Sequence, residues 1–172
     1  MWKLINALGF QAGWWACVAG VGARYEIEAL IFCAILISLH LHFSKIVKQE
    51  TILAAIAVLI GVVTDSLLQY FSVIDFYGWA LGSASPFWLW MLWAMFGLTL
   101  NSSLEFLKTQ SRTTAAFLGL TLGPLTYYAG AKLGAANLDA TPAHIVLLAA
   151  AWTIALPLLV MAAEHTSPKD TT

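Results

Sequence analysis

The segment from Thr51 to Val63 carries no charged residue, and Asp65 follows two residues later in the same apolar surroundings. About 20 largely apolar residues are enough for an α-helix to cross the hydrocarbon core of a bilayer. A carboxylate inside such a helix costs about 2.5–3.5 kcal/mol on insertion scales, and proteins keep one only where it faces protein, water or a partner. The sequence therefore predicts a membrane-spanning helix whose Asp65 face is sheltered by the rest of the chain.

The composition extends this interpretation to the whole chain. Hydrophobic residues make up 60% of the sequence and charged residues 10%, whereas soluble domains have about 45–50% apolar and about 25% charged residues. The formal net charge of −1 argues against a nucleic-acid-binding protein, because such proteins need basic clusters to neutralise phosphates. The lipid bilayer is thus the first partner that the sequence predicts.

The length criterion divides the chain into six spans. We predict an all-α membrane protein with a single domain, residues 1–165, in which a bundle of six transmembrane helices is followed by a polar tail at 166–172. The predicted spans are residues 4–22, 27–43, 51–71, 86–104, 113–133 and 142–163. Residues 72–85 are rich in glycine and serine, so we expect an interfacial or re-entrant loop there. Asn6 and Gln11 interrupt the first apolar run, which favours a retained span over a cleaved signal peptide.

The basic residues of the loops predict the orientation, because cytoplasmic loops are enriched in Lys and Arg. One side collects Lys3, Lys45, Lys48, Lys108, Arg112 and Lys169, whereas the other has only Arg24 and Lys132. We therefore predict a multi-pass protein with both its N- and C-termini in the cytoplasm.

Polar residues in different spans can be compared by depth, because an α-helix rises about 1.5 Å per residue. By this measure Asp65 and Tyr128 lie at about the same depth in two spans that run in the same direction. The predicted outer polar cluster consists of Asp65, Gln69, Tyr128, Lys132, Arg24 and Glu28. Asp65 has three interpretations: it fixes helix register with Tyr128 or Lys132, it binds a ligand or proton, or it is solvated in a cavity.

A second set of polar residues is level near the cytoplasmic side. The predicted inner polar cluster consists of Asn6, Gln11, His40, Asn101, Ser102 and Glu105. Asn and Gln side chains commonly hydrogen-bond across membrane helices. His40 and His42 are two residues apart and point to nearly opposite faces of a helix, whereas joint metal ligation requires a spacing of four. We therefore predict no metal site, and we expect these histidines near the lipid headgroups.

The remaining chemically distinctive residues have structural interpretations. Trp88, Trp90 and Trp93 are expected in the aromatic belt at the outer interface. Cys17 and Cys33 lie in apolar runs and are expected to be small buried hydrophobic residues. A disulfide between them is the alternative, but no second pair of cysteines or extracellular framework supports it. The sequence contains no GxSxG, HExxH, P-loop or glycine-rich dinucleotide motif. No cofactor is predicted, and the motifs give no positive sign of an enzyme.

Several short motifs resemble those of a known family. They include Asn6 with Phe10, Gln11 and Trp14, then Asp65-Ser66, Pro86 with the Trp-rich run, TLNSSL at 99–104, and Gly123-Pro124-Leu125 with Tyr127, Tyr128, Gly130 and Leu133-Gly134-Ala135. Over nearly its whole length the chain resembles a bacterial inner-membrane family, domain of unknown function 2878. The resemblance implies a multi-pass inner-membrane protein and, because members lie among genes for cyclopropane fatty-acid synthesis and related lipid modification, a lipid-linked role. It carries over no active site.

These observations lead to one functional hypothesis and two alternatives. The main hypothesis is an accessory factor in membrane-lipid modification or envelope maintenance, with other membrane proteins of lipid modification as possible partners. The first alternative is a small cation- or proton-coupled permease in which Asp65 binds the cation or proton. The second is a membrane-embedded enzyme that acts on a lipid or quinone through Asp65, Tyr128 and Lys132.

Overall fold

A computed structural model describes residues 1–167 and contains six α-helices, one short 3₁₀ helix and two short strands. Residues 168–172, which make up most of the predicted polar tail and include Lys169, lie outside the described residues. In chain order the elements are α1 (Trp2–Gly22), α2 (Glu26–Phe43), α3 (Val47–Tyr70), β1 (Ile74–Phe76), α4 (Phe87–Thr99), η1 (Glu105–Thr109), α5 (Arg112–Lys132), β2 (Ala136–Leu138) and α6 (Pro142–Thr166).

Four helices are long and apolar enough to cross a membrane by length and composition: α1, α2, α3 and α6. α5 has the same length as α1, 21 residues, but it is richer in threonine. α4 has only 13 residues, which corresponds to about 20 Å and falls short of a hydrocarbon core of about 30 Å. The expected helix at 86–104 is therefore too long. Helical geometry stops before Asn101, Ser102 and Ser103, whose polar side chains compete with the backbone for hydrogen bonds.

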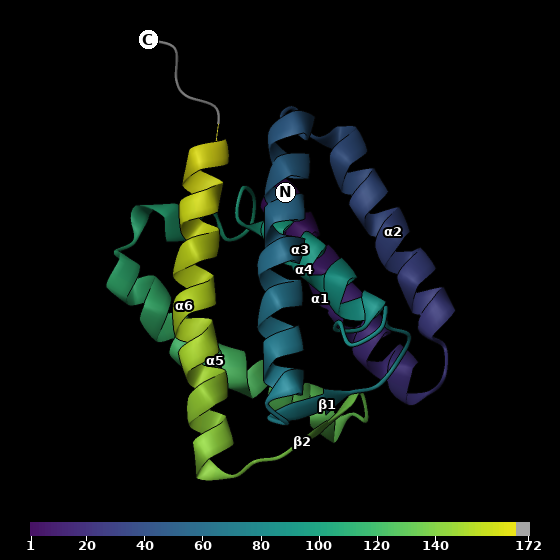
Figure 1. The fold of residues 1–172 in the computed structure, drawn as a ribbon. Coiled ribbons are helices and arrows are strands. Elements are labelled where there is room, and N and C mark those ends of the chain that lie inside the picture. The colour runs from purple at the N-terminus through teal and green to yellow at the C-terminus, as the bar shows by residue number, and fades with distance from the viewer. Residues whose placement is uncertain (168–172) are drawn as a thin grey trace.

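Helices that follow one another in the sequence pack together in pairs, and so do three pairs that are farther apart in the chain. α1 packs on α2, α3 on α4 and α5 on α6, and the long-range pairs are α3 with α6, α1 with α4 and α2 with α4. In Figure 1, α3 and α6 stand upright in front, and α1 and α4 cross behind α3. α1 begins and α6 ends toward the upper end of this view, whereas β1 and β2 lie at the lower end.

β1 and β2 form an antiparallel pair in which Asp75 lies opposite Asn137. The sequence did not predict these strands, because three residues are too few to produce an alternating pattern. The rest of the connection between α3 and α4 is held by specific contacts. The Trp79 N–H donates to the Glu26 carboxylate at 2.9 and 3.0 Å, and Trp88 Nε1 donates to the Tyr77 carbonyl at 2.8 Å.

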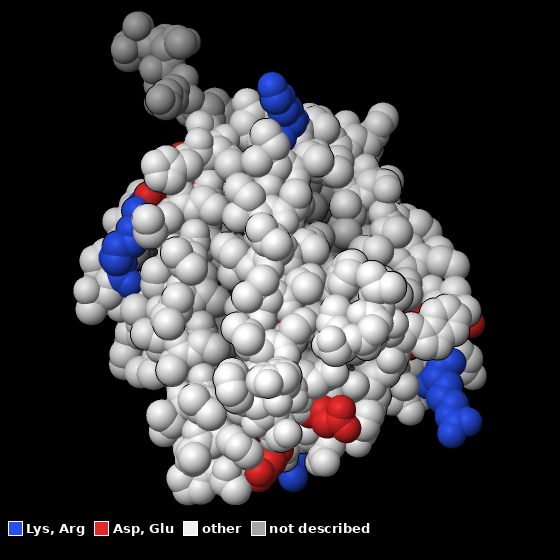
Figure 2. Space-filling model, in the orientation of Figure 1, with Lys and Arg blue, Asp and Glu red and all other residues white. Residues whose placement is uncertain are grey.

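Charged side chains are distributed unevenly over the surface. On the face shown in Figure 2 they lie toward the upper and lower ends and along the edges, and the centre of the face carries none. Large apolar side chains such as Leu59, Ile154 and Val146 are more than half exposed. An uncharged, apolar face of this kind suits a hydrocarbon environment, in which a charged side chain is costly.

Candidate functional site

The centre of the helix bundle contains a fully buried acid, Asp65 of α3. Trp93 Nε1 of α4 donates a hydrogen bond of 2.7 Å to Asp65 Oδ2, and the Tyr127 hydroxyl of α5 donates to Asp65 Oδ1. Each carboxylate oxygen thus has one neutral donor, and the three residues connect three helices. Hydrogen bonds to a charged carboxylate stabilise a protein more than those between neutral groups. They also offset the cost of burying the Asp65 carboxylate away from water.

The partner of Asp65 is Tyr127 and not the predicted Tyr128. The Tyr128 side chain is 47% exposed, and Lys132 Nζ lies 5.2 Å from the centre of its ring. Consecutive helical residues point about 100° apart, since a turn contains 3.6 residues. Depth comparison therefore identified the correct level on α5 but could not identify the face. Within residues 1–167 no Lys or Arg forms an ion pair with Asp65.

The other predicted outer residues do not join Asp65. Gln69 is half-buried, and its Oε1 has no hydrogen-bond partner among the described residues. Arg24 and Glu28 are exposed at the junction of α1 and α2. The structure instead buries Glu26, which holds the Trp79 backbone. A charge beside a loop looks solvent-exposed in the sequence, so nothing there distinguishes Glu26 from Glu28.

The predicted inner cluster is brought together in part. Asn6 Oδ1 accepts from the Ser103 backbone N–H at 3.3 Å and from its hydroxyl at 2.6 Å. The Asn6 amide nitrogen therefore faces His40, with Nδ2 at 3.2 Å from His40 Nδ1. His40 Nε2 in turn lies 3.1 Å from Glu50 Oε1. Both His40 and Glu50 are buried, and Glu50 is a member that sequence reasoning missed because it stands beside a loop lysine.

The remaining inner residues have separate contacts. Asn101 Oδ1 accepts from Lys108 Nζ at 3.0 Å, whereas the buried hydroxyl of Ser102 has no partner in the described part of the chain. Glu105 pairs with Lys3 at 2.8 Å, and this hydrogen bond lowers the pKa of the Glu105 carboxyl. Gln11 is exposed. His42 is exposed as well, and no group of three potential metal ligands occurs within residues 1–167.

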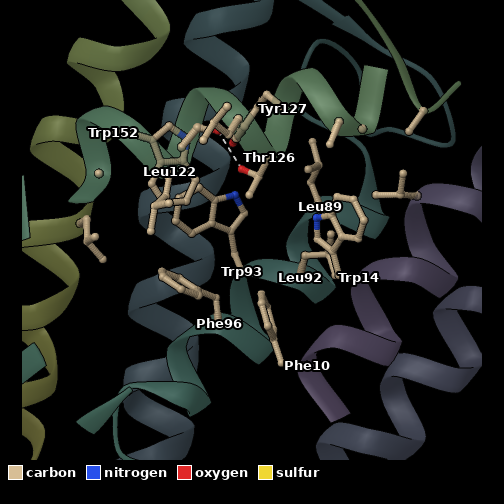
Figure 3. Close-up of a pocket in the computed structure, with 18 of the residues that line it drawn as sticks. Phe10, Trp14, Leu89, Leu92, Trp93, Phe96, Leu122, Thr126, Tyr127 and Trp152 are labelled. Carbon is tan, nitrogen blue, oxygen red and sulfur yellow. Dashed lines mark hydrogen bonds between the residues drawn. The ribbon is translucent and has the colours of Figure 1, made fainter. Parts of the chain in front are cut away.

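A cavity of about 620 Å³ lies between α5 and the pair α1 and α4, and α6 closes it on one side. In Figure 3, Trp93 reaches from α4 toward Thr126 and Tyr127 of α5, with Phe10 and Trp14 of α1 on the other side. The Trp93 and Trp152 rings stack with centroids 5.0 Å apart. The wall is almost wholly apolar, and along α5 it extends from Leu118 to Ala131, a distance of about 20 Å.

The tryptophans of α4 correct an expectation. Trp88 and Trp93 are 3% and 4% exposed, so they line the cavity and are not anchors of an interfacial belt. Trp90 is half-buried, and its Nε1 donates to the Ser85 carbonyl at 2.9 Å. Tryptophan marks interfaces because its indole N–H needs a polar partner, and here the protein itself supplies those partners.

Trp93 reaches Asp65 because the helices that surround it approach closely. A Cβ atom at Gly61 of α3 would lie 2.1 Å from Trp93 Cγ, and one at Gly123 of α5 would lie 2.2 Å from Trp152 Cγ. The indole rings thus occupy the places of the missing side chains. Glycines at helix interfaces are typical of membrane proteins.

Two further features are distinct from this cavity. A smaller cavity of about 280 Å³ is lined by residues of α1 and α2, including Gly9 and His40. Cys17 and Cys33 are free thiols with their sulfurs 3.4 Å apart, and both are fully buried, as expected for small buried residues.

Comparison with known proteins places the chain in a family. The model of the family described as "Protein of unknown function (DUF2878)" matches residues 3–158. The match covers most of the chain, and the protein therefore belongs to this family. No curated protein and no solved structure matches it.

Proposed function

We propose that this DUF2878 protein is a multi-pass protein of the bacterial inner membrane that holds the hydrocarbon tail of a membrane lipid in its cavity. In this capacity it is an accessory factor in membrane-lipid modification or envelope maintenance, and its partners are other membrane proteins of lipid modification. The observation that carries the proposal is the apolar cavity of about 620 Å³ between α5 and the pair α1 and α4.

The size and chemistry of the cavity support a lipid tail as its occupant. Small-molecule sites typically have volumes of about 300–1,000 Å³ and apolar walls with few polar groups. On the cavity wall, Trp93 Nε1 and the Tyr127 hydroxyl donate to Asp65, and the Thr126 hydroxyl donates to the Gly123 carbonyl. The buried Nε1 of Trp152 has no partner in the described part of the chain. An occupant therefore meets aromatic and aliphatic surface, which favours a hydrocarbon chain.

The exposed side of the cavity also favours a lipid as its occupant. Leu122 and Leu125 of α5 line the cavity and are 53% and 62% exposed. In a bilayer, such residues face acyl chains. The α5 side of the cavity is thus in contact with the hydrocarbon of a bilayer.

We predict that both termini face the cytoplasm. Reporter fusions after Lys48 and Arg112 are expected to give cytoplasmic signals, and fusions after Ala80 and Asn137 periplasmic signals, because basic residues concentrate on the first side. The second pair belongs to the end of the molecule where β1 joins β2. A periplasmic signal after Lys48 would contradict the six-span arrangement.

Photolabelling tests the proposed occupant. A phospholipid with a diazirine in its tail is incorporated into nanodiscs with the protein, and labelled residues are mapped by mass spectrometry. We expect labelling of Trp93, which lines the cavity and is only 4% exposed, in addition to outward-facing residues such as Leu59 and Val146. An unlabelled natural phospholipid is expected to compete at Trp93 at concentrations that leave Leu59 labelled. Labelling confined to outward-facing residues would overturn the proposal.

A proton-coupled permease is the second candidate, and one observation favours it. Asp65 is fully buried, and its two hydrogen-bond donors are neutral, so a proton is a natural counter-charge for it. Proton flux into proteoliposomes that Asp65→Asn abolishes would favour the permease. Labelling of the cavity without flux would favour lipid binding.

A further inference from the structure

We infer that the cavity is a one-ended tail site, entered at the η1 end and closed by β1 and β2, in which Gly130 limits the length of the chain that fits. This inference rests on the proposed function and deepens it, because it specifies the lipid class and the direction in which the lipid binds. The ligand is a phospholipid whose tail points from the basic side toward Gly130.

The two ends of the cavity differ in burial. At one end, β1 and the segment that leads into β2 supply Ile74, Phe76, Ala135 and Ala136, and each of these lining residues is at most 7% exposed. At the other end the lining includes the buried Leu107 of η1, but also Phe106 of η1, which is 55% exposed, and the exposed Gln11 of α1. We call the buried end the floor of the cavity and the exposed end its mouth.

The charges near the mouth match a phosphate. Lys3, Lys108 and Arg112 belong to this end of the molecule, whereas Lys132 is the basic residue at the opposite end of α5. Lys108 Nζ contacts two neutral groups, Asn101 Oδ1 and Ser167 Oγ, each at 3.0 Å. Lys3 and Arg112 each pair with an acid, whereas Lys108 forms no ion pair with a described residue and its charge acts on Glu105 and Glu164 without direct contact.

The floor is shaped by small side chains. The cavity wall there includes Ala129, Gly130, Ala131, Ala135 and Ala136 in addition to Ile74 and Phe76. Gly130 is buried, yet a Cβ atom built on it would have no atom within 4 Å. A buried glycine beside open space is a position where a side chain can be added into the cavity without displacing protein.

The distances agree with a single tail. The wall on α5 is about 20 Å long, and the tails of one leaflet occupy about half of a hydrocarbon core of about 30 Å. A tail that enters at the mouth therefore spans most of the cavity, and its terminal carbons come near Gly130. A larger side chain at this position shortens the space that the terminal carbons occupy.

The test measures selectivity for chain length. The purified full-length protein is equilibrated with vesicles of dimyristoyl, dipalmitoyl and distearoyl phosphatidylglycerol in equal amounts, and retained lipids are counted by native mass spectrometry. Gly130→Leu is expected to lower the ratio of distearoyl to dimyristoyl lipid retained by about tenfold, the order of discrimination that a few methylenes give in an apolar pocket. Gly130→Ala is expected to lower it by a smaller factor.

Gly9→Leu is the matched control. Gly9 is also a helical glycine with no atom within 4 Å of a built Cβ, but it lines the smaller cavity. Gly9→Leu is therefore expected to retain distearoyl and dimyristoyl lipid in the same ratio as the wild type. If the wild type retains no lipid, the proposed function itself fails. Two results would overturn the inference about Gly130 even if the wild type retains lipid. In the first, Gly130→Ala and Gly130→Leu have the same ratio of distearoyl to dimyristoyl lipid as the wild type. In the second, Gly9→Leu changes this ratio as much as Gly130→Leu does.

Discussion

Gly61→Ala is expected to destabilise the folded protein by about 3 kcal/mol, at the upper end of what an added methyl group costs in a packed core. The new Cβ would lie 2.1 Å from Trp93 Cγ and 2.2 Å from two neighbouring ring atoms. The indole cannot yield without moving Nε1 away from Asp65 Oδ2, to which it donates at 2.7 Å. The substitution therefore combines steric overlap with a weakened hydrogen bond to a buried acid. Thermal unfolding in detergent, followed by tryptophan fluorescence, measures the loss.

Gly130→Ala is the control for this substitution. It makes the same chemical change inside a helix, at a buried position where the added methyl group meets no atom within 4 Å. Alanine is more favourable than glycine in a helix interior by about 0.5–1 kcal/mol, so the midpoint of unfolding is expected to rise slightly. Equal destabilisation by the two substitutions would contradict the close approach of Trp93 to α3.

Tyr127→Phe is expected to destabilise the protein by about 2 kcal/mol, the range for a hydrogen bond to a charged group. The hydroxyl is the donor to Asp65 Oδ1, and its removal leaves that oxygen without a partner in a site with no access to water. Tyr128→Phe is the control at the adjacent residue, where the side chain is about half exposed and lies beneath Lys132. Its effect is expected to stay within about 0.5 kcal/mol, as for most surface substitutions.

A double-mutant cycle distinguishes the hydrogen bond from general packing. In an Asp65→Asn background the acid is gone, so the further effect of Tyr127→Phe is expected to fall to less than half of its value in the wild type. An undiminished effect would assign the loss to the ring environment of Tyr127, which packs edge-on against Phe76 and Trp152. A Tyr128→Phe effect as large as that of Tyr127→Phe would show that the assigned partner of Asp65 is wrong.

The helices were largely predictable from the sequence. Apolar runs of sufficient length identify α1, α2, α3 and α6, and their observed bounds differ from the predicted ones by four residues at most. α4 was overestimated because Leu100 and Leu104 continue its hydrophobicity beyond the helix. Hydrophobicity reports on the environment of a segment, but the end of a helix depends on local competition for backbone hydrogen bonds.

The candidate site was predictable only in its central residue. The cost of an acid among apolar residues points to Asp65, but its partners depend on the rotation of α4 and α5 about their own axes. That rotation is determined by contacts such as Gly61 with Trp93, which join residues 32 positions apart. The cavity was not predictable at all, because no sequence pattern marks a cavity. It depends only on how α1, α4 and α5 are placed relative to one another.

The spacing between Asp65 and its two donors has a consequence for biosynthesis. Trp93 follows Asp65 by 28 residues and Tyr127 follows it by 62. At a translation rate of about 5–20 residues per second, Tyr127 is made roughly 3–12 s after the acid. During this interval Asp65 has one of its two donors at most. The hydrogen bonds of Asp65 are thus completed late, only after α5 has been made.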